Sequence, residues 1–400
     1  MAGAGKPYFN DGVESHILLA ALGKLQRGSL HCSFPNGEEK IYNGSEHGVN
    51  ADIVIHDWRV LDRLITDNDV GFGEDYSAGL WDSSNLTSLQ HLLLANIEEL
   101  EAFIYGQRFH QYAAHFLKAK FRANTLRGSR QNIHEHYDLG NDFYSLWLDE
   151  SFTYSSALFE GDKRRSLQQA QLAKYERILT KLNATSGDHV LEIGCGWGGF
   201  SEVTARNGLN VTSVTISEEQ YNFANQRMSQ LELSNAEIRL QDYREVAEKF
   251  DHVVSIGMFE HVGEEFWPTY MTNVYDRLRA SGRAVIQTIT IRDDLFDAYR
   301  GSTDFLRKHI FPGGMLPTEK RFRKEAENVG FEVTDVFHFG QDYALTLEHW
   351  HQRFEVAIDD VRKLGFSDQF IRKWRFYLNG CEAAFRAGRI SVMQVTLVKT

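Results

Sequence analysis

The second half of the chain alternates between short apolar runs and longer stretches in which apolar residues recur at helical spacing. The short runs are typical of buried strands, and the longer stretches are typical of amphipathic helices. Strands are predicted at residues 189–193, 211–216, 237–240, 252–256, 283–289, 331–339 and 392–399. Helices are predicted at residues 164–182, 217–231, 268–278, 318–328, 343–364 and 368–386. This alternation predicts an α/β fold with a seven-stranded, doubly wound sheet that ends in an antiparallel hairpin.

The N-terminal part of the chain has a different pattern, which predicts a smaller α+β domain. A helix is predicted at residues 18–25, and short strands are predicted at residues 28–34, 39–43 and 51–55. A longer helix is predicted over residues 86–104, because six apolar side chains share one face: Leu89, Leu92, Leu93, Ile97, Leu100 and Phe103. Taken alone, this domain is interpreted as a scaffold or as a dimer contact, and the alternative is a module that helps to dock a lipid substrate.

Two unusual segments separate these regions. Residues 108–130 contain no Asp or Glu but six basic residues: Arg108, Lys118, Lys120, Arg122, Arg127 and Arg130. With its interspersed aromatic residues, this basic segment fits either a surface that lies on anionic lipid headgroups or a solvated linker helix. Residues 131–159 are rich in aromatic and polar residues, and they are predicted to form a lid that excludes water from a ligand.

Composition narrows the possible functions. A length of 400 residues fits two domains, and a net charge of −12 argues against general nucleic-acid binding. Cys32, Cys195 and Cys381 are too far apart for a CxxC zinc site, which predicts reduced thiols and no metal. The sequence shows neither a signal-like N-terminus nor an apolar run of membrane-spanning length, so a cytoplasmic protein is expected.

The stretch from Val190 to Gly199 reads Val-Leu-Glu-Ile-Gly-Cys-Gly-Trp-Gly-Gly. A buried strand that runs into several glycines is typical of Rossmann-like ligand sites, because backbone without Cβ atoms can approach a ligand closely. Related turns bind nicotinamide or flavin dinucleotides, and a tight turn without a ligand also fits. An acidic residue before the glycines resembles class I S-adenosylmethionine (SAM) methyltransferases, where it helps to position the ligand's amino-acid end. The candidate cofactor-binding residues here are Glu192, Gly194, Cys195, Gly196 and Gly198.

Polar residues follow the next two predicted strands. Thr215, Ser217 and Gln220 end the second strand, where a ribose hydroxyl needs partners. Asp242 and Tyr243 end the third, where adenine needs a hydrogen-bond acceptor and an aromatic neighbour. Ser217 and Asp242 are also good helix N-caps, so each has a purely structural alternative.

Several longer motifs resemble the cyclopropane-fatty-acyl-phospholipid synthase family, which includes the mycolic-acid cyclopropane synthases. The resemblance covers about residues 50–400, and its motifs lie at residues 136–144, 153–157, 190–199, 257–263, 310–317, 340–343 and 380–386. It implies a lipid-associated α+β domain at 1–115, a basic linker and aromatic lid at 116–160, and a SAM-dependent methyltransferase domain at 161–400. It also adds Tyr154 and Ser155 to the cofactor-binding residues.

The resemblance implies an enzyme that adds a methylene group from SAM across a cis double bond of an acyl chain in a phospholipid. Transfer of a methyl group to an alkene leaves a carbocation, which water would quench. A closed pocket lined by aromatic rings protects such a cation. Candidates for this lining are Phe152, Tyr154, Phe159, Tyr243, Phe259 and Phe311.

Ring closure requires a base, and in the family the base is a bound bicarbonate ion. By motif, the resemblance assigns the anchors to the side chains of Glu260 and Tyr343 and to the backbone amides of Ser156 and Ile289. The chain departs from many members at two positions, because Ser156 replaces Cys and Gln287 replaces His. A glutamine can hydrogen-bond bicarbonate but cannot share a proton with it. Cys381 is interpreted as a buried apolar residue and not as a nucleophile.

Several functional alternatives remain open. The same cation can lose a proton elsewhere and give a methyl-branched or methylene-branched chain, or a furan precursor. A second alternative is a SAM methyltransferase that acts on a small soluble substrate. A third is a lipid-binding protein without catalytic activity. The expected partners are an unsaturated phospholipid, the anionic inner face of the membrane through transient peripheral contact, and a second copy of the chain in a homodimer.

Overall fold

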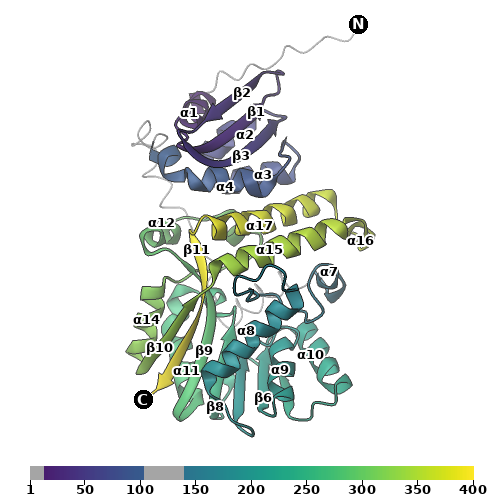
Figure 1. The fold of residues 1–400 in the computed structure, drawn as a ribbon, viewed down its shortest axis with the longest axis vertical. Helices are drawn as coiled ribbons and strands as arrows, with labels where there is room; N and C mark the ends of the chain where they lie inside the picture. Colours follow the sequence, from purple (N-terminus) through teal and green to yellow (C-terminus); the bar gives the residue numbers. More distant parts are fainter. Residues whose placement is uncertain (1–12, 103–138) are drawn as a thin grey trace. The chain divides into compact units, whose positions relative to one another are not determined.

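The computed structural model describes residues 13–102 and 139–400 (Figure 1). Contacts within the chain divide it into two compact units. Unit 1 comprises Met1–Lys120, Gly301–His309 and Gly365–Ala387, as far as these are described. Unit 2 comprises Phe121–Arg300, Ile310–Leu364 and Gly388–Thr400, with the same restriction.

Unit 2 contains the predicted seven-stranded sheet. Its strands are β5 (His189–Ile193), β6 (Asn210–Thr215), β7 (Ala236–Leu240), β8 (Phe250–Ile256), β9 (Leu278–Ile291), β10 (Phe331–His338) and β11 (Ile390–Lys399). The strand order is β10-β11-β9-β8-β5-β6-β7. Strand β11 runs antiparallel to both β9 and β10, whereas β5 to β9 pair in parallel. The α/β fold class and the terminal antiparallel hairpin are therefore confirmed.

Helices cover both faces of this sheet (Figure 1). Val190 of β5 packs in the cluster formed with α8 (Leu167–Leu182) and α9 (Gly199–Arg206). Its neighbours Leu191 and Ile193 belong to the cluster formed with α11 (Trp267–Arg277) and α14 (Glu319–Asn328). Because side chains alternate along a strand, the sheet separates an α8 face from an α11 face. Helix α10 (Glu218–Gln230) packs against β6 and β7.

One long predicted helix of unit 2 is divided in the structure. The segment predicted as one helix at 343–364 forms α15 (Gly340–Val356) and α16 (Ile358–Lys363), with Ala357 between them. The shorter elements, some of which were not predicted, are α7 (Asn141–Ser145), η2 (Tyr243–Glu245), η3 (Phe259–His261), η4 (Glu264–Phe266), η5 (Asp293–Leu295), α12 (Phe296–Gly301) and α13 (Phe305–His309).

Unit 1 is an α+β structure built on a small sheet with the order β2-β1-β3-β4. Its strands are β1 (Arg27–Ser33), β2 (Glu39–Asn43), β3 (Glu46–Ile55) and β4 (Trp81–Asp82). Strands β1 and β3 pair in parallel, and the β1–β2 pair is antiparallel. The larger helices are α1 (Val13–Leu22), α2 (Arg59–Thr66), α3 (Asn68–Ser77), α4 (Leu86–Ala95) and α17 (Asp368–Arg386).

The helix predicted at 86–104 is interrupted, because α4 ends at Ala95. The next residue, Asn96, is fully buried, and its side chain satisfies the backbone near β1. Its amide oxygen accepts from the N–H groups of Gln26 and Arg27 at 2.8 and 2.9 Å, and its nitrogen donates to the carbonyl of Arg27 at 2.9 Å. These bonds fix Asn96 in a conformation that breaks the helix.

Helix α17 belongs to unit 1, where it packs on α3 and α4. Arg372 donates to the carbonyl oxygens of Tyr76 and Trp81, and Thr87 donates to the side chain of Asn379 at 2.5 Å. Cys381, on the same helix, is buried as expected. The predicted boundary at residues 115 and 116 and the basic segment 108–130 lie outside the described residues. The division at 115 and 160 stays a prediction.

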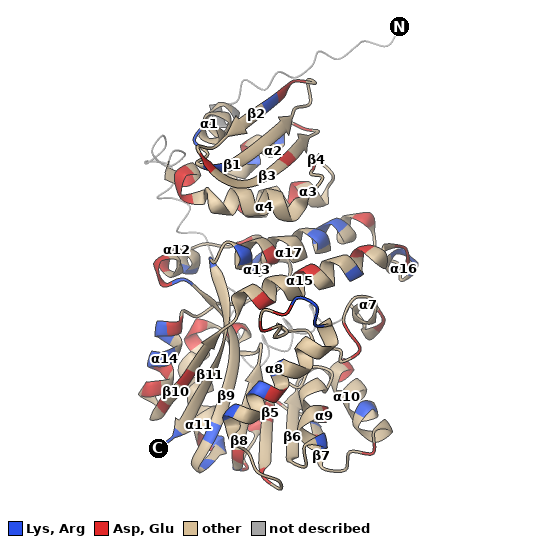
Figure 2. Ribbon diagram, in the orientation of Figure 1, with Lys and Arg blue, Asp and Glu red and all other residues tan. Residues whose placement is uncertain are grey.

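Within the described residues, no helix is both long and apolar enough to cross a membrane. Among the same residues, no cluster of His, Cys, Asp and Glu could hold a metal ion. Figure 2 shows acidic and basic residues interspersed along α14 and α17, so these helices carry both signs of charge.

Candidate active site

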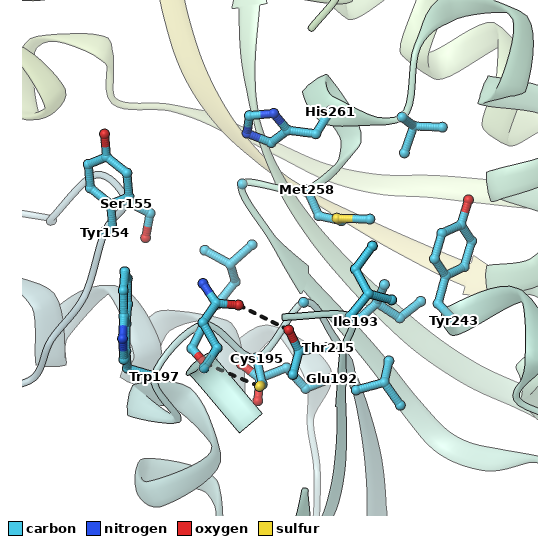
Figure 3. Close-up of a pocket in the computed structure, with 18 of the residues that line it drawn as sticks. Tyr154, Ser155, Glu192, Ile193, Cys195, Trp197, Thr215, Tyr243, Met258 and His261 are labelled. Atoms are coloured by element: carbon cyan, nitrogen blue, oxygen red, sulfur yellow. Dashed lines mark hydrogen bonds between the residues drawn. The ribbon is translucent and has the colours of Figure 1, made fainter. Parts of the chain in front are cut away.

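A pocket lies in unit 2 at the carboxyl ends of β5, β6 and β8 (Figure 3). Its empty volume is about 1390 Å³, including the part that is open to solvent. In Figure 3, Tyr154 and Trp197 stand on one side of the pocket and Tyr243 on the other. Ten of the twelve predicted cofactor-binding residues line it: Tyr154, Ser155, Glu192, Gly194, Cys195, Gly196, Thr215, Gln220, Asp242 and Tyr243.

The glycine turn after β5 leaves room for a ligand. Gly194 and Gly196 have φ values of +85° and +51°, which favour glycine. A Cβ atom built on Gly196 would meet no heavy atom within 4 Å, although this residue lines the pocket. Gly198 does not line the pocket. A Cβ atom there would lie 3.2 Å from that of Ala224, so Gly198 permits close packing against α10.

Glu192 places a buried carboxyl group at the wall of the pocket. It is 2% exposed and accepts hydrogen bonds from Ser201 at 2.6 Å and Ser213 at 2.7 Å. Burial raises the pKa of Glu192 to about 7, against the opposing effect of the two serines. The group therefore gains its negative charge in the neutral pH range.

The ends of β6 and β7 present ordered polar groups. Thr215 donates to Gln220 at 3.0 Å, while Ser217 caps α10 and does not line the pocket. Ser217 is thus placed as a helix N-cap, which was its structural alternative to a role in ligand binding. Asp242 caps η2 and lines the pocket, where Arg244 donates to its two carboxylate oxygens at 2.8 and 2.7 Å. Arg244 was not predicted as part of the site.

Aromatic rings support one side of the pocket. The ring of Tyr154 lies 5.4 Å from that of Trp147 and 5.3 Å from that of Trp350, and both tryptophans are fully buried. Phe152, Tyr243 and Phe311 also line the pocket, as predicted. Two further candidates, Phe159 and Phe259, are not among the residues that line this pocket: Phe159 stacks on His349, and Phe259 stacks on Trp267 in the core.

Glu260 lies directly behind the pocket wall. It is 5% exposed and accepts from the hydroxyl of Thr288 at 2.9 Å and from the N–H of Ile289 at 3.4 Å. A Cβ atom on the pocket-lining Gly257 would lie 3.8 Å from Oε1 of Glu260 and 3.9 Å from Cβ of Ser155. Burial raises the pKa of Glu260 to about 7. Two predicted residues, Glu260 and Ile289, are therefore in direct contact.

The other three predicted catalytic residues have other neighbours. Gln287 is 2% exposed and its side-chain oxygen accepts from Gln394 at 3.1 Å on the α8 face of the sheet. Ser156 is fully buried, and Tyr343 packs edge-on against Trp350 at 6.0 Å. None of the five predicted catalytic residues lines the pocket itself.

Besides Arg244, sequence reasoning missed several side chains that line the pocket, among them Trp197, Met258 and His261. His261 lies across the pocket from Tyr154 (Figure 3). Burial lowers the pKa of His261 to about 4, so its imidazole is neutral at physiological pH. The signal was available for this residue, because His261 directly follows Glu260 in a motif that was recognised.

The sheet order, the glycine turn and the acidic residue at the end of β5 together define a class I SAM-dependent methyltransferase. The same fold occurs in the mycolic acid cyclopropane synthase CmaA1 complexed with SAH and CTAB. That structure has a TM-score of 0.64 and 33% identity, and the match covers 68% of this chain and 98% of that one. The family model for mycolic acid cyclopropane synthetase matches residues 124–395, and the chain belongs to this family.

Two curated relatives extend the match into the N-terminal region. The chain is 36% identical over 345 residues to the tuberculostearic acid methyltransferase UfaA1 of Mycobacterium tuberculosis, covering 82% of this chain and 79% of the relative. It is 35% identical over 350 residues to the cyclopropane-fatty-acyl-phospholipid synthase of Escherichia coli (strain K12), covering 86% and 87%. The chain is therefore an enzyme of the SAM-dependent methyltransferase class, and its relatives are lipid methyltransferases and cyclopropane synthases.

Proposed function

We propose that this enzyme converts the cis double bond of an unsaturated acyl chain in a phospholipid into a cyclopropane ring. The observation that carries the proposal is the position of Glu260, a buried carboxyl group directly behind Gly257 at the pocket wall. A methyltransferase that only transfers a methyl group to a basic atom needs no such group next to its reacting centre. Ring closure does need one, because a carbon-bound proton must be removed.

The pocket fits SAM at both ends. Glu192 suits the ammonium of the amino-acid end, and the open space at Gly196 leaves room for the ligand. Asp242 and Tyr243 suit the adenine ring, with Arg244 holding the Asp242 carboxylate in place. When bound, SAM supplies an electrophilic methyl group. The chain's contribution is to hold the acceptor carbon in line with that group and to exclude water.

We propose that bicarbonate is held beside Glu260. The backbone N–H of Ile289 lies at this position, where it makes a long bond of 3.4 Å to Glu260 that an anion could replace or share. The resemblance adds Tyr343, the backbone amide of Ser156 and the side chain of Gln287 as further donors. When bound, bicarbonate supplies the base. Gln287 is a neutral amide whose oxygen is already engaged by Gln394, so it can orient an anion but cannot take up a proton.

A second product class has support of its own. One relative is named as a tuberculostearic acid methyltransferase and another as a cyclopropane synthase, and their identities to this chain are 36% and 35%. Overall similarity therefore does not separate the two products. The alternative proposal is that the enzyme forms a methyl-branched or methylene-branched chain, with Gln287 affecting where the proton is lost.

The experiment that separates these outcomes is lipid analysis after incubation of the enzyme with SAM and oleoyl phospholipid vesicles. A cyclopropane product gains one CH₂ group and no longer reacts with an alkene-specific reagent. A methylene-branched product gains the same CH₂ group but still reacts. Methylation of soluble small molecules without any lipid product would instead support a soluble substrate and refute both lipid proposals.

We further propose that the enzyme is cytoplasmic and reaches its substrate by transient contact with the anionic inner face of the membrane. The support is the basic composition of residues 108–130 in a chain of net charge −12. On vesicles of anionic phospholipid, replacing Lys118, Lys120 and Arg122 with glutamine should weaken binding, most strongly at low salt. Binding that is equal for both proteins at every salt concentration would favour a linker role.

The affinity for SAM should depend on the ionisation of Glu192. Its pKa is about 7, so its charge increases as the pH rises from about 6 to 8 and attracts the ligand's ammonium more strongly. We expect SAM affinity to rise by roughly tenfold over this range, the scale of a charge-assisted hydrogen bond. Calorimetric titration measures this, and in Glu192→Gln the pH dependence should disappear. A pH dependence that survives the substitution would assign it to another group.

A further inference from the structure

Lys174 is a fully buried lysine on α8, and it was not among the predicted site residues. A buried lysine is costly unless its ammonium group finds partners. Its Nζ donates to the hydroxyl of Ser155 at 2.7 Å and to the side-chain oxygen of Gln171 at 2.8 Å. Gln171 in turn donates to the backbone carbonyl of Ser155 at 2.9 Å. Two residues of α8 therefore hold both the side chain and the backbone of Ser155.

Ser155 connects this buried group to the pocket. It lines the pocket beside Tyr154 (Figure 3). Because the Ser155 oxygen accepts a hydrogen bond from Lys174, its own proton is free to point elsewhere. The hydroxyl can then donate to an acceptor in the pocket, such as a carboxylate oxygen.

A carboxyl group and a hydroxyl donor near Lys174 complement the two charged ends of an amino acid. Burial lowers its pKa well below the usual value, and the carboxylates of Asp149 and Glu192 act in the opposite direction. Glu192 lines the same pocket. An α-amino acid carries an ammonium and a carboxylate two bonds apart, so a buried carboxyl next to a lysine-supported hydroxyl complements it.

We infer that Lys174 is a positioning residue, which orients the Ser155 hydroxyl toward the carboxylate of the SAM amino-acid end. The inference rests on the assignment of this pocket to SAM. The simpler role for Lys174 is structural, since the same bonds tie residues around 155 to α8. The two roles differ in one respect: only the first depends on whether the ligand has a carboxylate.

Calorimetric titration with SAM and with decarboxylated SAM, which keeps the amine and the sulfonium, separates the two roles. Lys174→Met should lower the affinity for SAM by roughly tenfold to a hundredfold and change that for decarboxylated SAM by less than about threefold. Ser155→Ala should show the same selectivity, and the double variant should be little worse than Ser155→Ala alone. Lys181→Met is the matched control on α8, because Lys181 pairs with Asp335 away from the pocket.

An equal loss for both ligands in Lys174→Met, or an unchanged affinity for SAM, would overturn the inference. If Lys174→Met does not fold, Ser155→Ala alone decides, because a uniform effect on both ligands contradicts a carboxylate contact. Failure of the unmodified enzyme to bind SAM would instead refute the assignment of the pocket, and that result is distinguishable from a loss seen only in the variants.

Discussion

Replacing Gly196 with valine is expected to lower the affinity for SAM at least a hundredfold. The φ value of +51° at this position already disfavours a β-branched residue. The larger effect is steric, because a Cβ atom here meets no heavy atom within 4 Å and Gly196 lines the pocket, so we expect the valine side chain to occupy pocket volume. The branched side chain and the ligand would then compete for one volume. Calorimetric titration with SAM measures the loss directly.

Gly187→Val is the matched control for this variant. Gly187 has a φ value of +92°, a Cβ atom there would also meet nothing within 4 Å, and it does not line the pocket. Both variants should lose stability through backbone strain, on the order of 1–2 kcal/mol. Only Gly196→Val should lose SAM. A Gly196→Val enzyme that binds SAM like the unmodified one would place the ligand elsewhere.

The sequence predicted the sheet of unit 2 well because each strand is a short apolar run with its own local signal. The positions of β5 and of the glycine turn follow from adjacent residues, and so does most of the cofactor pocket. The break after α4 could not be predicted in this way. It depends on Asn96 reaching the backbone of Gln26 and Arg27, about 70 residues earlier in the chain. A single buried amide leaves no periodic signal.

Which segments belong to unit 1 depends on contacts between residues that are even further apart in the sequence. Arg372 reaches the carbonyl of Tyr76 across 296 residues, and α17 therefore joins a unit whose other larger helices are N-terminal. Its apolar face predicts a helix but does not identify the partner. Lys174 was missed for a related reason, because a lysine on an amphipathic helix normally faces water. Its burial arises from the packing of residues near 155 over α8, which the sequence of α8 does not encode.

Glu260→Gln is expected to reduce turnover at least a hundredfold while SAM affinity stays within about twofold, since loss of a positioned acid or base typically costs this much. Glutamine has the same shape, and its amide oxygen can still accept from Ile289 as the carboxylate does. What it removes is a group that ionises near pH 7. Because Glu260 does not line the pocket, cofactor binding should be spared. Steady-state kinetics and calorimetric titration give the two quantities.

Dependence on bicarbonate tests whether Glu260 acts through the proposed base. Bicarbonate-free buffer should slow the unmodified enzyme and leave the residual turnover of Glu260→Gln unchanged, because that variant has lost its anchor for the anion. Glu264→Gln is the control, since Glu264 forms an ion pair with Arg300 at 2.7 Å and does not line the pocket. It should retain full turnover and full bicarbonate dependence. Normal turnover in Glu260→Gln would show that proton removal does not depend on this carboxyl group, and it would refute the proposed role of Glu260 as an anchor of the base.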